Sequence, residues 1–157
     1  MVDLFQYNWD VRDDWFTWCE SLSEEEFHQA RIGGMKSFRE TIIHIVDCEL
    51  LWLNTILGER ITYENRETLY HLEEIKQYSA FVQSQTEAFL GNIKPGNDTR
   101  IIEVKRRDGT VLHFSQKKIV AHMITHEIHH IGQLSVWARE IGLKPVSSDL
   151  IIRNVYE

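Results

Sequence analysis

Apolar residues recur at every third or fourth position along four long stretches of this 157-residue chain, and this spacing is what most constrains its fold. The stretches cover residues 4–21, 38–57, 69–90 and 116–141. Such a period gathers the apolar side chains on one face of an α-helix, and that face must be buried. The sequence therefore predicts an all-α protein, an antiparallel four-helix bundle that forms a single domain over residues 1–157.

Residues that favour helix starts and stops stand at the ends of these stretches. Ser23 followed by residues 24–26, all glutamate, predicts a capped short helical turn, and Gly33-Gly34 predicts a loop after it. Ser37 opens the same capping pattern before the second long stretch, and Gly58 is placed to end it. The helix boundaries are therefore expected from local chemistry as well as from periodicity.

A different pattern precedes the last long helix. Residues 101–104 and 111–114 are short, mostly apolar runs on either side of Asp108-Gly109, the preferred pair for a tight hairpin turn. We expect a small β-hairpin there, followed by a helix that Ser115 caps. Residues 146–157 are too apolar for a free tail, so we expect them to pack on the bundle or on another subunit.

Composition excludes several classes of function. The net charge of −7 disfavours binding to nucleic acid, which depends on neutralising phosphates. No apolar run reaches the ~18 residues that a membrane span requires, and no secretory signal pattern is present, so we expect a cytoplasmic protein that binds neither membrane nor nucleic acid. Cys19 and Cys48 are too few for a disulfide framework and are expected to be thiols.

The last long stretch contains four histidines within nine residues: His122, His126, His129 and His130. Residues i and i+4 lie on the same face of a helix, so two imidazoles at that spacing can bind one divalent ion. His122 with His126 and His126 with His130 both have this spacing, and spacing alone does not choose between them. His129 points about 100° away from His130 and does not share its ion easily.

A third ligand must come from another helix. His44 stands out because isoleucines and valine surround it in the second long stretch, and a buried imidazole needs a partner. Cys48, one turn later, could bind the ion as a thiolate, which would complete a tetrahedral structural site. We favour the other interpretation, in which Cys48 is a small buried side chain that packs like an apolar residue. Four side chains could orient an imidazole or a bound water, although each is more typically solvated: Glu40, Asp47, Glu127 and Gln133.

Two further groups of side chains have ordinary explanations. The tryptophans could wall an apolar substrate pocket, but at helical spacing we expect them in the core: Trp9, Trp15, Trp18, Trp52 and Trp137. Basic residues around the hairpin could attract an anionic small molecule, but we interpret them as an exposed surface feature: Lys105, Arg106, Arg107, Lys117 and Lys118.

The chain resembles the DinB/YfiT-like family of metal-binding helical bundles over nearly its whole length. Residues 37–46 with Trp52-Leu53 resemble the family's first ligand helix, and residues 125–133 resemble its HxxxH-x-GQ motif. The resemblance selects His44, His126 and His130 as metal ligands and leaves His122 as a neighbour. Family members often have arginine where this chain has Ile131, so no guanidinium contact is expected there.

The resemblance implies a bound metal ion and a thiol-dependent reaction. Proteins similar to this one form four-helix bundles, often homodimeric, that hold a divalent ion such as zinc or nickel, and several are thiol-dependent transferases or isomerases. We therefore expect a homodimer that acts as a metal-dependent thiol S-transferase and joins a low-molecular-weight thiol to a small electrophilic substrate. The alternatives are a metal-dependent hydrolase with Glu127 or Asp47 as base, and a non-enzymatic bundle that binds a metal or small molecule.

Overall fold

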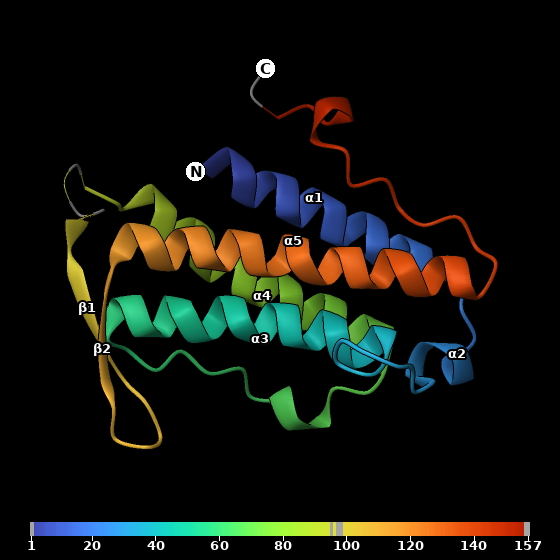
Figure 1. Cartoon of the computed structure of the whole chain (residues 1–157), viewed down its shortest axis with the longest axis horizontal. Helices are drawn as coiled ribbons and strands as arrows, with labels where there is room; N and C mark the ends of the chain where they lie inside the picture. The colour runs from blue at the N-terminus through green and yellow to red at the C-terminus, as the bar shows by residue number, and fades with distance from the viewer. Residues whose placement is uncertain (1, 95, 97–98, 156–157) are drawn as a thin grey trace.

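Four long helices form the body of the protein in a computed structural model, which describes residues 2–94, 96 and 99–155 (Figure 1). They are α1 (Val2–Cys19), α3 (Phe38–Leu57), α4 (Leu72–Gly91) and α5 (Gln116–Glu140). A short helix, α2 (Glu24–His28), lies between α1 and α3. The predicted helical bundle is confirmed.

The long helices run in two directions (Figure 1). Helices α1 and α5 run one way, and α3 and α4 run the other way. The neighbours α3 and α4 are parallel to each other, so residues 58–71 return along the length of the bundle between them, and this connection contains the 3₁₀ helix η1 (Arg66–Thr68). Helices α3 and α5 lie side by side and antiparallel, which places the middle of one next to the middle of the other.

Most of the predicted helix boundaries are confirmed. The side chain of Ser23 accepts a hydrogen bond from the backbone of Glu26, and Ser37 and Ser115 cap α3 and α5 in the same way. Gly58 ends α3 in the left-handed conformation with φ 70°, which glycine adopts without strain. The predicted start of the third long helix at Leu69 was wrong, because α4 begins at Leu72. Leu69 is buried, but it belongs to the preceding connection.

The predicted hairpin is also confirmed. Strands β1 (Ile101–Lys105) and β2 (Val111–Ser115) pair antiparallel, with Ile101 opposite Ser115. Gly109 has φ 86° and donates its N–H to the carbonyl of Arg106 at 3.0 Å, which closes the turn. Because β2 runs directly into α5, the hairpin lies against the end of the bundle where α5 begins (Figure 1).

Buried apolar side chains form two groups inside the bundle. The larger group contains Trp15, Phe38 and Trp137, and the smaller one, nearer the hairpin, contains Trp9 and Ile119. The expectation that tryptophans belong to the core is therefore confirmed for Trp9, Trp15 and Trp137. The other two, Trp18 and Trp52, are only partly buried.

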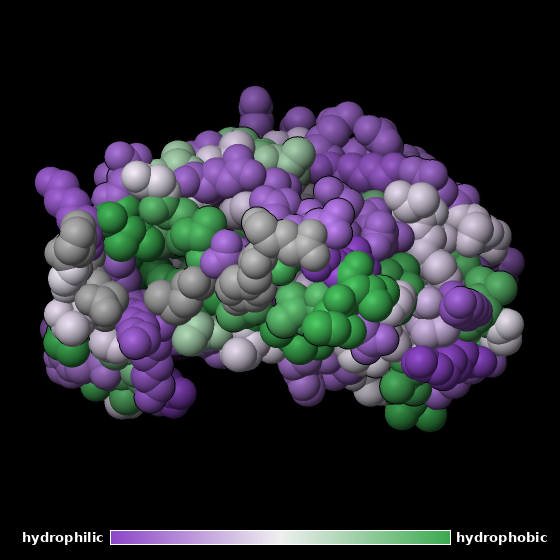
Figure 2. Space-filling view, turned by 90° about the horizontal axis from the view of Figure 1, so that it is seen from above, coloured by the Kyte–Doolittle hydropathy of each residue, from purple (hydrophilic) through white to green (hydrophobic). Residues whose placement is uncertain are grey.

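The segment that follows α5 packs along α1. Of the two predicted arrangements, packing on the bundle or on another subunit, the structure shows the first. The hydroxyl of Tyr7 donates to the carbonyl of Ser148 at 2.6 Å, and Arg153 pairs with Asp14 at 2.6 Å. The 3₁₀ helix η3 (Leu150–Ile152) in this segment leaves its own apolar side chains exposed. Apolar side chains gather on this face of the molecule, which Figure 2 shows from above. Residues 156–157 of the predicted segment lie outside the described residues.

No helix within the described ranges combines the length and the apolar character that a membrane crossing needs.

Candidate metal centre

Three imidazoles meet between the middle of α3 and the middle of α5. The Nε2 atom of His126 lies 3.1 Å from Nε2 of His44 and 3.2 Å from Nε2 of His130. Among the residues that the structure describes, these form the one group of at least three His, Cys, Asp or Glu side chains whose ligand atoms all lie within 4.8 Å of one another. The structure therefore brings together all three histidines that the sequence singled out.

The spacing of these nitrogens suits a single divalent ion. Zinc binds imidazole nitrogen at about 2.0–2.1 Å, so two nitrogens in a tetrahedral shell lie about 3.3 Å apart. The observed separations of 3.1 and 3.2 Å are close to that value. Nitrogen donors of this kind accept zinc, nickel and other divalent ions of the first transition series. The donor set and its geometry therefore fit the metal that the family resemblance implies.

The structure also separates the two histidine pairs that spacing left open. His126 and His130 both face His44, whereas His122 is exposed and its ring is tilted by 60° to that of His126, with centroids 5.6 Å apart. His129 is exposed as well and lies outside the group. The rotation of α5 about its own axis decides this, because it directs residues 126 and 130 toward α3.

Gln133 holds the His130 ring in a defined orientation. Its Oε1 atom lies 2.8 Å from Nδ1 of His130, and its Nε2 atom lies 3.3 Å from Nε2 of His129. An amide oxygen only accepts, so Nδ1 of His130 carries the proton and Nε2 presents its lone pair to the other two imidazoles. Of the four side chains predicted to orient an imidazole or water, Gln133 does so.

The loop that contains Gly33-Gly34 lies directly against the side chain of Gln133. A methyl group at Gly34 would lie 2.7 Å from Oε1 of Gln133 and 3.0 Å from the ring of Trp137. Gly34 also has φ 52°, which side-chain-bearing residues rarely adopt. The predicted Gly33-Gly34 loop therefore lets the backbone approach the residue that orients His130.

The surroundings keep the three imidazoles neutral. Burial, followed by the nearby imidazoles of His130 and His44, lowers the pKa of His126 to about 4. Burial also lowers the pKa of His44 and of His130, and His130 is only 7% exposed. A neutral imidazole has a free lone pair on one nitrogen, which is the form that binds a metal. At neutral pH the three rings are therefore ready to act as ligands.

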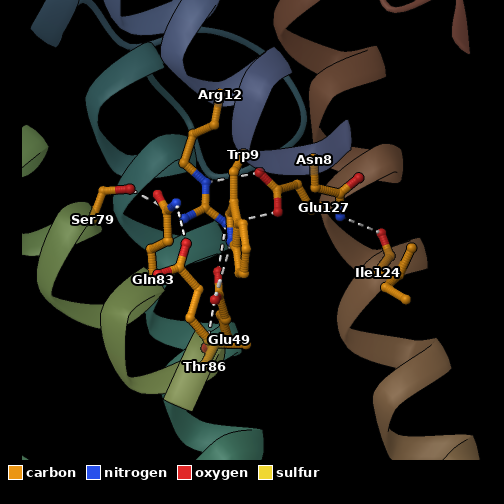
Figure 3. A network of polar contacts seen from close by, with 10 residues as sticks. Asn8, Trp9, Arg12, Glu49, Ser79, Gln83, Thr86, Ile124 and Glu127 are labelled. Atoms are coloured by element: carbon orange, nitrogen blue, oxygen red, sulfur yellow. Dashed lines mark hydrogen bonds and ion pairs between the residues drawn. The ribbon is translucent and has the colours of Figure 1, made fainter. Parts of the chain in front are cut away.

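A buried charge network lies next to these histidines and joins all four long helices (Figure 3). Arg12 on α1 donates to Glu127 on α5 at 2.7–2.8 Å, to Glu49 on α3 at 2.6 Å and to Ser79 on α4 at 3.1 Å. Thr86 donates to Glu49 at 2.6 Å. The network thus fixes the relative register of α3 and α5, the two helices that supply the histidines.

The network overturns the expectation that Glu127 is solvated. Glu127 is 4% exposed and is paired with Arg12. Burial raises the pKa of Glu127, while the charge of Arg12 lowers it. Sequence reasoning missed Arg12 and Glu49, although a signal was present. Arg12 falls on the apolar stripe of α1, between Trp9 and Phe16, where a charge needs a buried partner.

The other two polar candidates, Asp47 and Glu40, bind side chains other than the three imidazoles. Asp47 accepts hydrogen bonds from Arg66 at 2.6 Å and from the hydroxyl of Tyr78 at 2.9 Å. Glu40 is exposed and pairs with the neighbouring Arg39. Neither of these two carboxylates has a hydrogen bond to the three imidazoles within the described part of the chain.

Cys48 lies near the histidines in sequence but not among the grouped ligand atoms. It is buried, and burial raises the pKa of its thiol to about 12. A thiol in this environment remains protonated at neutral pH and behaves as a small apolar side chain. The structure thus agrees with the interpretation of Cys48 as a buried side chain that packs like an apolar residue. The candidate metal centre contains three imidazoles and not this thiol.

Comparisons with known proteins agree with this architecture. The sequence model of the DinB family matches residues 1–154. The protein YizA of Bacillus subtilis (strain 168) is 37% identical over 155 residues, which cover 99% of this chain and 96% of YizA. The crystal structure of a DinB-like protein from Bacillus cereus ATCC 10987 superposes with a TM-score of 0.65 at 19% identity, covering 91% of each chain.

Proposed function

Since the chain belongs to the DinB family, we propose that it binds one divalent metal ion, zinc or nickel, through His44, His126 and His130, and that it is a metal-dependent thiol S-transferase. The observation that carries this proposal is the convergence of three neutral imidazoles with no fourth side-chain ligand grouped with them in the described residues. Three protein ligands are typical of catalytic zinc sites, whereas structural sites use four.

The ion supplies one kind of chemistry when it is bound. A divalent ion lowers the pKa of a coordinated thiol, so that the thiolate nucleophile is available at neutral pH. In the proposed reaction the sulfur forms a bond to an electrophilic carbon. The leaving group departs with the electron pair of the broken bond, and the thiol proton passes to solvent.

Gln133 and the Arg12 network position the three histidines for metal binding. Gln133 fixes the tautomer and orientation of His130, which a metal ligand needs in order to present its lone pair. The Arg12 network holds α3 and α5 in register, so His44 meets the two imidazoles of α5. These contacts set the ligand positions before any ion binds, which reduces the cost of ordering them.

Neither of the two buried cysteines is placed to supply the sulfur itself. Burial raises the pKa of both Cys19 and Cys48 to about 12. A buried thiol with a pKa this high stays protonated at neutral pH and is shielded from substrate, so we do not assign either side chain as the nucleophile. A transferred sulfur would therefore come from a low-molecular-weight thiol, which enters with the small electrophilic substrate.

The hydrolase alternative has weaker support. It requires a carboxylate base beside the ion, and the two residues considered for that role were Glu127 and Asp47. Glu127 is held by Arg12, and Asp47 is held by Arg66 and Tyr78. A carboxylate whose oxygens already accept hydrogen bonds from a guanidinium is a poor general base, because those oxygens are not free to take a proton from a water molecule.

Turnover assays on recombinant protein test the proposal. Metal-free protein, reconstituted with zinc or nickel, is incubated with cysteine or glutathione and with 1-chloro-2,4-dinitrobenzene or monobromobimane. We expect conjugate formation that needs both metal and thiol and that disappears in His126→Ala. Ester hydrolysis without thiol would support the hydrolase instead. Stoichiometric metal binding without turnover on any thiol and electrophile would favour the non-enzymatic bundle.

A further inference from the structure

A cavity of about 380 Å³ lies where the hairpin meets α3 and the start of α5. Its walls are largely apolar and include Trp52 from α3 and Leu112 and Phe114 from β2. Binding sites for small molecules are concave, mostly apolar and about 300–1,000 Å³ in volume. The cavity therefore has the size and the lining of a site for a small organic molecule.

Aromatic contacts connect this cavity with the three imidazoles. The ring of Trp52 meets the ring of His122 edge to face, with centroids 5.4 Å apart. The ring of His122 in turn lies beside that of His126, tilted by 60° and with centroids 5.6 Å apart. Since His122 precedes His126 by four residues, about 6 Å along the helix axis separates them. A molecule in the cavity would have one end next to the metal ligands.

Two cationic side chains border the same cavity. Arg106 comes from the hairpin turn, and Lys118 comes from the first turn of α5. Both are exposed, as the sequence predicted for this basic group, and the ammonium of Lys118 lies over the ring of Phe114, 5.2 Å from its centroid. Within the described ranges neither cation lies within 4.0 Å of a carboxylate. Their charges are available to an anionic ligand in a chain whose net charge is −7.

We propose that this cavity binds the electrophilic substrate, and that the substrate is a small aromatic molecule with an anionic group. The aromatic body would pack on Trp52 and Phe114, the anionic group would lie between Arg106 and Lys118, and the reactive end would point past His122 toward His126. The assignment of the ligand as the electrophile rests on the proposed function. The binding of an aromatic anion in this cavity is a separate claim that can be measured without any metal.

A pair of fluorescent probes tests the binding claim on the full chain. The probes are 1-anilinonaphthalene-8-sulfonate and N-phenyl-1-naphthylamine, which share an aromatic body but differ in charge. We expect the sulfonate to bind at one site, about tenfold more tightly than the neutral probe at low ionic strength. Arg106→Gln with Lys118→Gln should weaken the sulfonate by about tenfold and leave the neutral probe unchanged, while Trp52→Ala should weaken both.

Arg107→Gln with Lys117→Gln is the matched control, because these cations are sequence neighbours of the other two and do not border the cavity. The control should leave both probes unchanged. Equal binding of the two probes, or equal loss of sulfonate binding in the two double variants, would overturn the claim. Sulfonate binding that survives Trp52→Ala would also overturn it, since the probe would then lie elsewhere. Circular dichroism confirms that each variant is folded.

A paramagnetic ion tests the direction of the bound molecule. In protein loaded with cobalt, the proton resonances of 2-naphthoate should broaden relative to the zinc-loaded protein, and Arg106→Gln with Lys118→Gln should abolish the effect. Broadening in neither metal form, despite bound cobalt, would show that the cavity does not deliver its ligand to the ion. Failure to bind cobalt at all would contradict the proposed metal site and would leave the probe titrations valid.

Discussion

Oε1 of Gln133 lies 2.8 Å from Nδ1 of His130, so an amide acceptor three residues along α5 fixes the imidazole that faces His44 and His126. Such contacts to a ligating histidine usually change metal affinity by about 10–100-fold when they are removed. Gln133→Leu should therefore weaken metal binding by that factor, as measured by competition with a chromophoric chelator. Gln133→Glu keeps an acceptor at the same position and should retain most of the affinity. Equal affinity in the leucine variant would contradict the orienting role.

Gly34→Ala should disturb the same contact from the opposite side. The added methyl would lie 2.7 Å from Oε1 of Gln133, so the amide must move away from His130. We expect lower metal affinity together with a loss of stability of about 1–2 kcal/mol from the left-handed backbone. Gly33→Ala is the control, because Gly33 has φ 82° but nothing within 4 Å of an added methyl. It should lose stability and keep its metal affinity, and a similar loss of affinity in both variants would refute the steric explanation.

Arg12→Met should destabilise the bundle strongly. Arg12 is 2% exposed and neutralises two buried carboxylates, Glu49 and Glu127. Removing one partner of a buried ion pair typically costs about 3–5 kcal/mol, because the remaining charge is left without compensation. Urea denaturation followed by circular dichroism measures the free energy of unfolding. Adding Glu49→Gln and Glu127→Gln to Arg12→Met should recover part of the loss, and a triple variant no more stable than the single one would argue against charge burial as the cause.

The cysteines should resist alkylation in the folded protein. Burial raises the pKa of Cys19 and Cys48 to about 12, so the reactive thiolate is scarce until the pH approaches that value. Iodoacetamide at pH 8 should modify the native chain far more slowly than the chain in urea, and mass spectrometry can count the adducts. Cys48→Ala should leave metal content unchanged. Loss of the metal in this variant would support the closed structural site that the histidine geometry disfavours.

Features that depend on neighbouring residues could be predicted from the sequence. Ser37, Ser115 and Gly58 satisfy helix ends through their own side chains or backbone, so their roles follow from local chemistry. The spacing of His126 and His130 is likewise a local property of one helix. Leu69 was misassigned because apolar periodicity reports burial, and Leu69 is buried in a connection outside the helix.

Features that depend on the arrangement of helices could not be predicted in this way. The residues alone did not separate the pair of His122 and His126 from that of His126 and His130, because the choice depends on how α5 is rotated against α3. The parallel course of α3 and α4 follows from the long return of residues 58–71, which has no distinctive motif. The cavity at Trp52 likewise joins α3 to the hairpin and the start of α5, which are far from Trp52 in sequence, so no local pattern reveals it.

Metal content of histidine variants tests the central claim most directly. Wild-type protein and single alanine variants are loaded with zinc, dialysed and analysed by inductively coupled plasma mass spectrometry. The claim predicts one ion per chain in the wild type, a loss of the ion in His44→Ala, His126→Ala and His130→Ala, and full retention in His122→Ala and His129→Ala. Retention of one ion per chain in the first three variants, or its loss in the His122 variant, would contradict it.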